Sequence, residues 1–263
     1  MTGGGARGDT AAMQLPELAS HRGGAFLWPE NSLLAFRHAL AFEAEQVELD
    51  IHASRDGEPV VMHDGTLNRT TDATGPVAAL DWEALRRVRV KGAGGEAMPH
   101  LREAARLILG GGKLLRLEVK RALNGVPYPG LMQAAAHAVP DRARTVIMSF
   151  SPAVVAEAAA LGGWRETVLL VEDLVVPAMR AADLVAACRA CGATELGVSI
   201  AVLREEVAQE VKAAGLRLSV WAANHAPSLR RALDPALALD AVATDDPPLA
   251  AALRAEAKRL RNA

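Results

Sequence analysis

The sequence has few residues of several kinds, and each scarcity excludes a class of protein. It contains one Tyr, four Phe and four Trp among 263 residues, so a buried core has to be mainly aliphatic. The formal net charge is only −2 at pH 7, which gives no reason to expect a nucleic acid or an anionic membrane as partner. No apolar run reaches the roughly 18 residues of a membrane-spanning helix, so we expect no stable membrane insertion.

Cysteine and export signals are also scarce. Cys188 and Cys191 are the only cysteines and form a C-x-x-C pattern within an Ala-rich helical stretch. No second Cys or His cluster completes a redox or metal site, so we expect two thiols that are at least partly buried on a helix. Residues 1–12 are Gly-rich and polar, and we interpret them as a disordered leader. Without an export signal or a disulfide framework, we expect a cytoplasmic protein.

The chain alternates between short apolar runs and helical patterns, which predicts a parallel sheet. The turn that follows the first run, His21-Arg22-Gly23-Gly24, lacks the G-x-G-x-x-G spacing of a dinucleotide-binding fold. Eight units in a chain close to the ~250 residues of a barrel favour a (β/α)₈ TIM barrel. We predict a single barrel domain over residues 13–263, with residues 64–99 as a small insertion after the second strand. The eight strands are expected around Leu18, Val47, Leu114, Val146, Val168, Leu196, Leu218 and Val242.

The second predicted strand, residues 46–52, alternates apolar and acidic residues. Glu48 and Asp50 point to the same side of the strand, about 7 Å apart along the chain. Two like charges at neighbouring inward positions repel each other unless a cation lies between them. Carboxylate oxygens suit Mg²⁺, Ca²⁺ or Mn²⁺ better than Zn²⁺. The alternative interpretation is a pair of exposed acids on an edge strand.

Polar residues recur where the predicted strands end, and this is the edge of a TIM barrel that carries the active site. Each residue alone has a structural explanation: a packed histidine, a solvated ion pair or a core tryptophan. Their convergence at one barrel mouth is the informative observation. The residues are His21 and Arg22, Glu48 and Asp50, Glu118 and Lys120, Trp221 with the nearby Asn224, and His63 on a loop after the second strand.

These residue types together suit cleavage of a phosphodiester. Three carboxylates can hold one divalent cation and leave positions open for substrate oxygens. Arg22 and Lys120 supply positive charge for an anion. His21 and His63, with ordinary pKa values near ~6.5, can act as acid and base near neutral pH.

The same residues stand in short motifs, namely His21-Arg22-Gly23, Pro29-Glu30-Asn31-Ser32, Glu48-Leu49-Asp50, Asp56-Gly57, Val60-Val61-Met62-His63-Asp64, Thr66-Leu67-x-Arg69-Thr70-Thr71, Leu117-Glu118-Val119-Lys120, Ser149-Phe150-Ser151, Val220-Trp221 and Thr244-Asp245. In order and spacing these motifs resemble the glycerophosphodiester phosphodiesterase family. The resemblance implies a TIM barrel with a small insertion and a divalent cation, Ca²⁺ or Mg²⁺, bound by Glu48, Asp50 and Glu118. It also implies catalysis by His21 and His63 and phosphate contacts from Arg22 and Lys120. Substrate contacts fall on Trp221, on the glycerol side, and on Asn31, for which a helix-cap role is the alternative.

We therefore expect a metal-dependent hydrolase that splits a glycerophosphodiester, a small-molecule substrate, into glycerol 3-phosphate and an alcohol. The few aromatic residues in the insertion favour small water-soluble diesters over lysophospholipids. The enzymatic alternative is a phosphodiesterase of the sphingomyelinase or lysophospholipase D type. The alternatives from other classes are a non-catalytic barrel that binds a phosphorylated ligand, and a barrel whose rim charges are only structural ion pairs.

Overall fold

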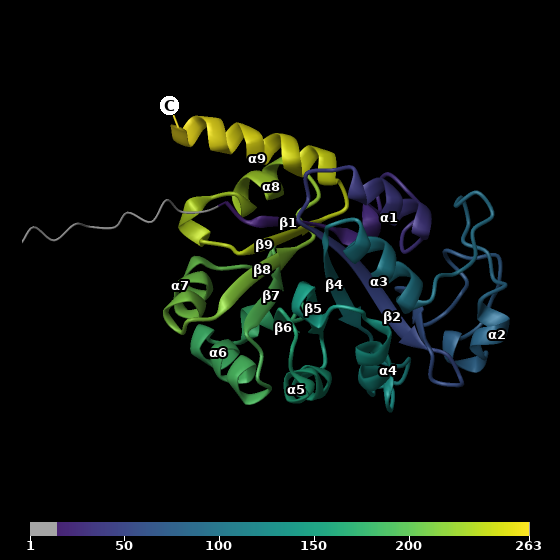
Figure 1. Ribbon diagram of the computed structural model, residues 1–263. Helices are drawn as coiled ribbons and strands as arrows, with labels where there is room; N and C mark the ends of the chain where they lie inside the picture. Colours follow the sequence, from purple (N-terminus) through teal and green to yellow (C-terminus); the bar gives the residue numbers. More distant parts are fainter. Residues whose placement is uncertain (1–14, 263) are drawn as a thin grey trace, which may run out of the picture.

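A computed structural model describes residues 15–262 and shows a closed barrel surrounded by helices (Figure 1). One nine-stranded sheet runs in the order β1-β9-β8-β7-β6-β5-β4-β2-β3, and pairing of β1 with β2 closes the barrel. All strand pairs are parallel except β2–β3. The TIM-barrel prediction is confirmed, and the strands are β1 (Glu17–Ser20), β2 (Gln46–Ala53), β3 (Pro59–Val61), β4 (Leu114–Val119), β5 (Thr145–Ser149), β6 (Glu166–Leu170), β7 (Glu195–Ser199), β8 (Arg217–Trp221) and β9 (Ala241–Thr244).

Helices connect the strands and cover the outside of the barrel, as parallel strands require. Across residues 15–262, no helix has both the length and the apolar character needed to cross a bilayer. The predicted leader, residues 1–12, lies outside the described residues. The α-helices are α1 (Leu33–Leu40), α2 (Trp82–Leu85), α3 (Leu101–Gly110), α4 (Leu131–Ala138), α5 (Pro152–Leu161), α6 (Ala181–Ala190), α7 (Glu205–Ala213), α8 (Ala226–Ala232) and α9 (Pro247–Asn262).

The alternation of β2 separates an apolar layer from a polar interior. Val47, Leu49 and Ile51 are fully buried in a cluster formed with the neighbouring helices. Burying one side chain of this size stabilises a fold by about 1.5–3 kcal/mol. The same period of two turns Glu48 and Asp50 to the opposite side, so the packing of the apolar residues fixes where the acids point.

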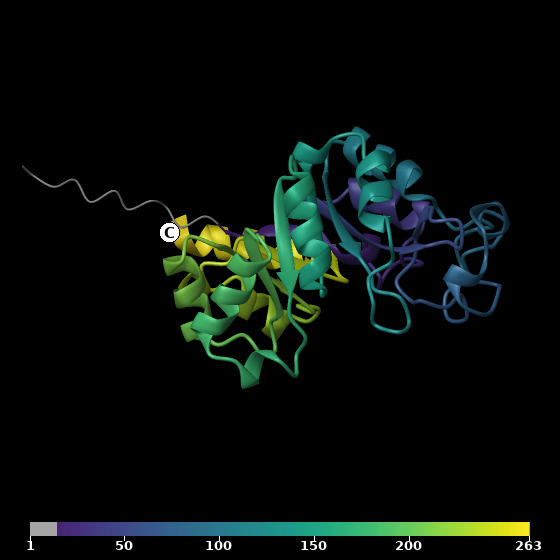
Figure 2. The same ribbon diagram turned by 90° about the horizontal axis from the view of Figure 1, so that it is seen from below.

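The segment between β3 and α3 forms a small structure of its own beside the barrel (Figures 1 and 2). It contains α2 and turns held by isolated bridges such as Thr66–Pro76 and Thr71–Val90. Its apolar side chains form a separate cluster around Leu67, Val77 and Leu85. The segment therefore has its own packing while remaining attached to the edge of β2 through β3.

A buried ion pair closes the interior of the barrel near the amino ends of the strands. Arg116 Nη2 lies 2.5 Å from Glu195 Oε1 and also donates to Ser219 Oγ at 2.8 Å. Both charged side chains are almost completely buried. Burial alone would raise the pKa of Glu195, but the Arg116 guanidinium holds this pKa below its usual range. The carboxylate is therefore ionised in the folded protein.

We expect Arg116→Met to lower the free energy of unfolding by about 3–5 kcal/mol, because it removes the nearest cation from the buried Glu195 carboxylate and leaves the more distant Arg217 and the Ser219 hydroxyl as its partners. Urea denaturation at pH 7 measures the change. Arg55→Met is the matched control, since Arg55 and its partner Asp81 are exposed and such a pair contributes at most about 1 kcal/mol. Equal effects of the two substitutions would contradict the prediction.

The same pair gives a pH dependence with a definite sign. Folding lowers the pKa of Glu195 from its ordinary value of 4.5, so its contribution is complete above that pH. The contribution is lost as the pH falls through the lowered pKa. The free energy of unfolding of the Arg116→Met variant should therefore fall less steeply in acid than that of the wild type.

Candidate active site

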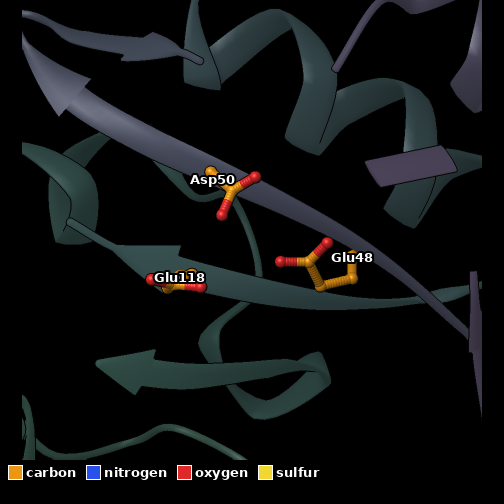
Figure 3. Close-up of side chains that lie close together, drawn as sticks. All are labelled: Glu48, Asp50 and Glu118. Carbon is orange, nitrogen blue, oxygen red and sulfur yellow. The ribbon is translucent and has the colours of Figure 1, made fainter. Parts of the chain in front are cut away.

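Three carboxylates from β2 and β4 meet in the interior of the barrel (Figure 3). Glu48 and Asp50 come from β2 and Glu118 from β4, and one oxygen of each lies within 4.8 Å of the others. The strand register causes this contact, because Asp50 is paired directly with Glu118. Glu48 and Asp50 are completely buried and Glu118 is 6% exposed, so the alternative of exposed edge-strand acids is excluded.

The carboxylates differ in how their charge is compensated. Burial and the neighbouring Asp50 raise the pKa of Glu48 to about 7. Burial would also raise the pKa of Asp50, but Lys120 and Arg22 hold it well below its usual range. Burial raises the pKa of Glu118 despite the nearby Lys120 ammonium. The cluster therefore carries more acidic groups than its protein cations neutralise.

The two predicted phosphate-binding cations lie against these acids. Lys120 Nζ is 2.6 Å from Glu118 Oε1 and 2.8 Å from Asp50 Oδ1. Arg22 Nε lies 3.4 Å from Asp50 Oδ2, and the Arg22 main-chain N–H donates to Glu48 Oε2 at 2.7 Å. Arg22 adopts a left-handed backbone conformation with φ of 51°, which brings that N–H onto Glu48.

Each of the two predicted catalytic histidines contacts an aspartate through Nδ1. His21 Nδ1 lies 2.6 Å from Asp245 Oδ1, and His63 Nδ1 lies 2.8 Å from Asp64 Oδ1. An ionised carboxylate only accepts hydrogen bonds, so Nδ1 of each ring carries the proton and Nε2 is the nitrogen left for proton transfer. His21 Nε2 lies 3.9 Å from Glu48 Oε2.

A cavity of about 400 Å³ lies above the acidic cluster and is lined by both histidines. Arg22, Lys120 and Trp221 also line it, and the Trp221 ring makes an edge-on contact with Phe150 at 6.1 Å between centroids. Trp221 Nε1 is buried and has no hydrogen-bond partner among residues 15–262. The geometry thus brings most of the predicted site residues around one cavity.

Asn31 lies beside the acidic cluster rather than on the cavity wall. Its Nδ2 donates to Asp50 Oδ2 at 2.8 Å, and its Oδ1 accepts from the Asp50 main-chain N–H at 3.2 Å. The cap of α1 is Ser32, whose Oγ accepts from Ala35 N at 3.0 Å. Asn31 therefore holds Asp50 in place, and its assignment to substrate binding stays a prediction.

The donor set fits a hard divalent cation. Glu48 Oε1 is buried without a hydrogen-bond partner in the described part of the chain, which is costly for a carboxylate oxygen unless a cation lies beside it. All three side chains offer only oxygen atoms, which Mg²⁺ and Ca²⁺ prefer. Glu48, Asp50 and Glu118 therefore form a candidate site for a divalent cation.

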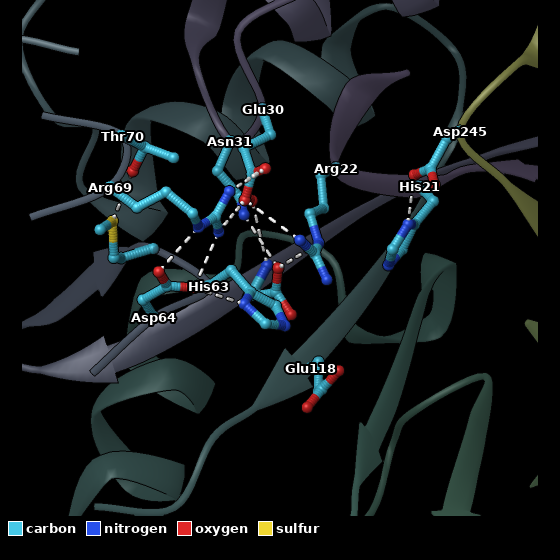
Figure 4. A network of polar contacts seen from close by, with 12 residues as sticks. His21, Arg22, Glu30, Asn31, His63, Asp64, Arg69, Thr70, Glu118 and Asp245 are labelled. Carbon is cyan, nitrogen blue, oxygen red and sulfur yellow. Dashed lines mark hydrogen bonds and ion pairs between the residues drawn. The ribbon is translucent and has the colours of Figure 1, made fainter. Parts of the chain in front are cut away.

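A network of charged groups that the sequence did not reveal connects the two sides of the site (Figure 4). Arg69 donates to both oxygens of Asp64 and to both oxygens of Glu30, at 2.7–2.8 Å. Glu30 also accepts from Arg22 Nη1 at 3.1 Å. The network therefore runs from His63 through Asp64, Arg69 and Glu30 to Arg22. Arg69 and Glu30 stood in motifs of the sequence, but only the folded chain shows what they contact.

Asp245, the aspartate that contacts His21, is itself held by Asn224. Asn224 Nδ2 donates to Asp245 Oδ2 at 2.5 Å, and Asp245 N donates back to Asn224 Oδ1 at 2.9 Å. Asp245 directly follows β9, at the same strand-end position as the other site residues. That position was the available signal for Asp245, but no local pattern predicted that it would contact His21.

The fold and the charge arrangement define a class: (β/α)₈ barrels with an acidic, candidate cation-binding site at the carboxyl ends of their strands. A model of the glycerophosphoryl diester phosphodiesterase family matches residues 21–249. The chain belongs to this family, which confirms the resemblance seen in the sequence.

Individual relatives are consistent with this membership. A glycerophosphodiester phosphodiesterase of Caldanaerobacter subterraneus subsp. tengcongensis is 32% identical over 140 residues, which span 50% of this chain and 57% of the relative. Human glycerophosphodiester phosphodiesterase 1 is 49% identical over 69 residues, which span 26% of this chain and 21% of the relative. The matched part of this chain thus spans about half or less of the length of these curated relatives.

Solved structures match over almost the whole chain. A candidate glycerophosphoryl diester phosphodiesterase from Agrobacterium tumefaciens has a TM-score of 0.86 and 29% identity, covering 94% of this chain and 100% of that one. An Oleispira antarctica phosphodiesterase in complex with the product sn-glycerol-3-phosphate has a TM-score of 0.77 and 25% identity, covering 93% and 97%.

The contact between His21 and Asp245 can be tested by titration. Burial lowers the pKa of His21, but Glu48 and Asp245 outweigh burial and raise it above its ordinary value. We expect Asp245→Asn to lower this pKa in the metal-free protein, as measured by NMR of the His21 ring proton. Asp183→Asn, at an exposed position on α6, is the control and should leave it unchanged. An unchanged pKa in Asp245→Asn would show that the contact is absent in solution.

Proposed function

We propose that this protein is a metal-dependent hydrolase that converts a glycerophosphodiester into glycerol 3-phosphate and an alcohol. The observation that carries the proposal is the cluster of three buried carboxylates within 4.8 Å, bordered by two imidazoles and two cations at one cavity. Family membership supports the same reaction. The Oleispira relative, whose structure contains sn-glycerol-3-phosphate, supports the expected product.

Arg22 and Lys120 are placed to bind the phosphate group of the substrate. Both line the cavity and both already contact carboxylates, so their charge is fixed in position before the substrate arrives. Arg22 can offer two N–H groups to a phosphate, whereas Lys120 acts as a point charge. The Trp221 indole N–H, which is buried and has no hydrogen-bond partner within residues 15–262, can donate to a glycerol hydroxyl.

His21 and His63 transfer the protons that the reaction requires. Nε2 of one ring accepts the proton of the attacking oxygen, from water or from a glycerol hydroxyl, and the other ring protonates the departing alcohol. Asp245 and Asp64 hold the rings in the tautomer that this exchange needs. Arg69 fixes Asp64 and, through Glu30, also fixes Arg22.

Glu48, Asp50 and Glu118 would hold Mg²⁺ or Ca²⁺ beside the phosphate. When bound, such a cation neutralises charge on the phosphate and so favours attack at phosphorus. Asn31 keeps Asp50 oriented toward the cluster.

Metal dependence provides one test. We expect chelation to abolish hydrolysis of glycerophosphocholine and added Mg²⁺ or Ca²⁺ to restore it. Glu118→Gln removes one anionic ligand and should weaken metal binding, measured by calorimetry, by about 10–100-fold or more. Glu103→Gln, at an exposed position on α3, is the matched control. Full activity after chelation would exclude the proposed metal dependence.

Proton transfer provides a second test. We expect His21→Ala and His63→Ala each to reduce kcat by about 10²–10⁴-fold, because each removes one acid or base. Release of glycerol 3-phosphate measures the rate, and His137→Ala, exposed on α4, serves as the control. Near-normal turnover in either variant would remove that histidine from the mechanism. Binding of the diester without any product in the wild type would favour the non-catalytic barrel.

A further inference from the structure

A second cavity, of about 420 Å³, adjoins the catalytic one. Five residues line both cavities, so the two share a border that includes Glu118 of the acidic cluster. The shared residues are His63, Glu118, Lys120, Phe150 and Glu172. A phosphodiester carries two ester arms on one phosphorus atom, and a phosphate bound at this border would direct one arm into each cavity.

The two cavities differ in the hydrogen-bonding groups that line them. The catalytic cavity alone contains His21, Arg22 and Asn224, beside apolar residues such as Met148 and Leu170. It also contains the Trp221 indole N–H, which has no hydrogen-bond partner within residues 15–262. These groups suit an arm rich in hydroxyl groups, such as glycerol. Most residues that line only the second cavity are apolar or are glycines, namely Gly65, Val119, Ala122, Leu123 and Gly125. The polar residues that line only this cavity are His52, Arg121 and Ser149.

These three polar side chains already bond to other groups of the protein. Both ring nitrogens of His52 are used, Nδ1 with the Tyr128 hydroxyl at 3.0 Å and Nε2 with the His63 carbonyl at 2.9 Å. Ser149 Oγ donates to the Val119 carbonyl at 2.7 Å. Arg121 Nη2 lies 3.1 Å from Glu172 Oε1, so these two charges neutralise each other. Two carboxylates of the described chain line the second cavity, and each contacts a cation: Glu118 contacts Lys120, and Glu172 contacts Arg121.

The outer wall of the second cavity is a tight hairpin between β4 and α4. The Gly125 N–H donates to the Ala122 carbonyl at 2.8 Å, and the Ala122 N–H donates to the Val126 carbonyl at 2.9 Å. Leu123 packs toward Gly65, where an added Cβ would lie 2.6 Å from Leu123 Cδ2. Nevertheless Leu123 is 66% exposed and Val126 is 56% exposed. An apolar surface thus continues from the cavity to the solvent.

We infer that the second cavity binds the leaving alcohol, and that this alcohol is uncharged and carries an alkyl chain extending over Leu123 and Val126. The inference rests on the proposed function and names its substrate class. The scarcity of aromatic residues in the insertion had favoured small water-soluble diesters. The apolar surface comes instead from aliphatic residues of the hairpin between β4 and α4.

Two substrate comparisons test the inference on the metal-loaded wild type, with every diester below its critical micelle concentration. The first is a series of glycerophosphoryl esters of ethanol, butanol, hexanol and octanol. We expect kcat/KM to rise by about fourfold per buried methylene until the chain passes the hairpin. The second compares glycerophosphocholine with the ester of 3,3-dimethylbutanol, its uncharged carbon analogue. We expect the uncharged ester to have the higher kcat/KM.

Variants in the wall of the second cavity test whether this cavity causes the dependence of kcat/KM on chain length. Leu123→Ser should reduce the ratio of kcat/KM between the hexyl and ethyl esters by at least about threefold. Gly65→Ala should change the same ratio, because the new methyl group displaces Leu123. Leu260→Ser, at an exposed position on α9, is the matched control and should leave the ratio unchanged.

The possible failures are distinguishable. Hydrolysis of all esters with a flat or falling chain-length series, or a preference for choline over its uncharged analogue, overturns the inference and leaves the proposed function intact. A chain-length series that Leu123→Ser and Gly65→Ala both leave unchanged also overturns the assignment of the cavity. No hydrolysis of any ester overturns the proposed function, and the inference with it.

Discussion

The direct pairing of Asp50 with Glu118 across β2 and β4 is the constraint on which the site depends. Parallel strands place register partners about 5 Å apart, so two carboxylates at paired inward positions cannot separate. Glu48, two residues earlier on β2, adds a third charge to the same interior. The arrangement is unfavourable by itself, and the surrounding cations and N–H donors are arranged to compensate for it.

That compensation explains several local features. Arg22 takes a left-handed conformation, and its main-chain N–H reaches Glu48 as a result. Asn31, also left-handed, uses both ends of its amide on Asp50. Residues in sparsely populated backbone regions persist only where their surroundings hold them, and such residues concentrate at functional sites. Here two of them bond directly to the acids of the cluster.

The two ends of the barrel treat buried charge differently. Near the amino ends of the strands, Arg116 and Glu195 satisfy each other within the barrel interior. At the carboxyl ends, Glu48 Oε1 and Trp221 Nε1 are buried without hydrogen-bond partners in the described chain. The paired charges near the amino ends contribute to stability, and the proposed function assigns the unpaired atoms at the carboxyl ends to ligand binding. This division is the one expected for a barrel of this type.

The sequence by itself was enough to predict the barrel, the acidic cluster and the location of both histidines at one barrel mouth. Strand alternation is a local property, so Glu48 and Asp50 had to share a face, and a chain of eight βα units had to place its strand ends at one mouth. Only the tertiary structure decided which groups contact each other across that mouth. Asp245 holds His21 from 224 residues away, and Arg69 joins Asp64 to Glu30 across 39 residues. Such contacts depend on loop conformations, which have no period in the sequence. The second cavity likewise arises where the hairpin between β4 and α4 meets Gly65, and no local pattern in either segment encodes that meeting.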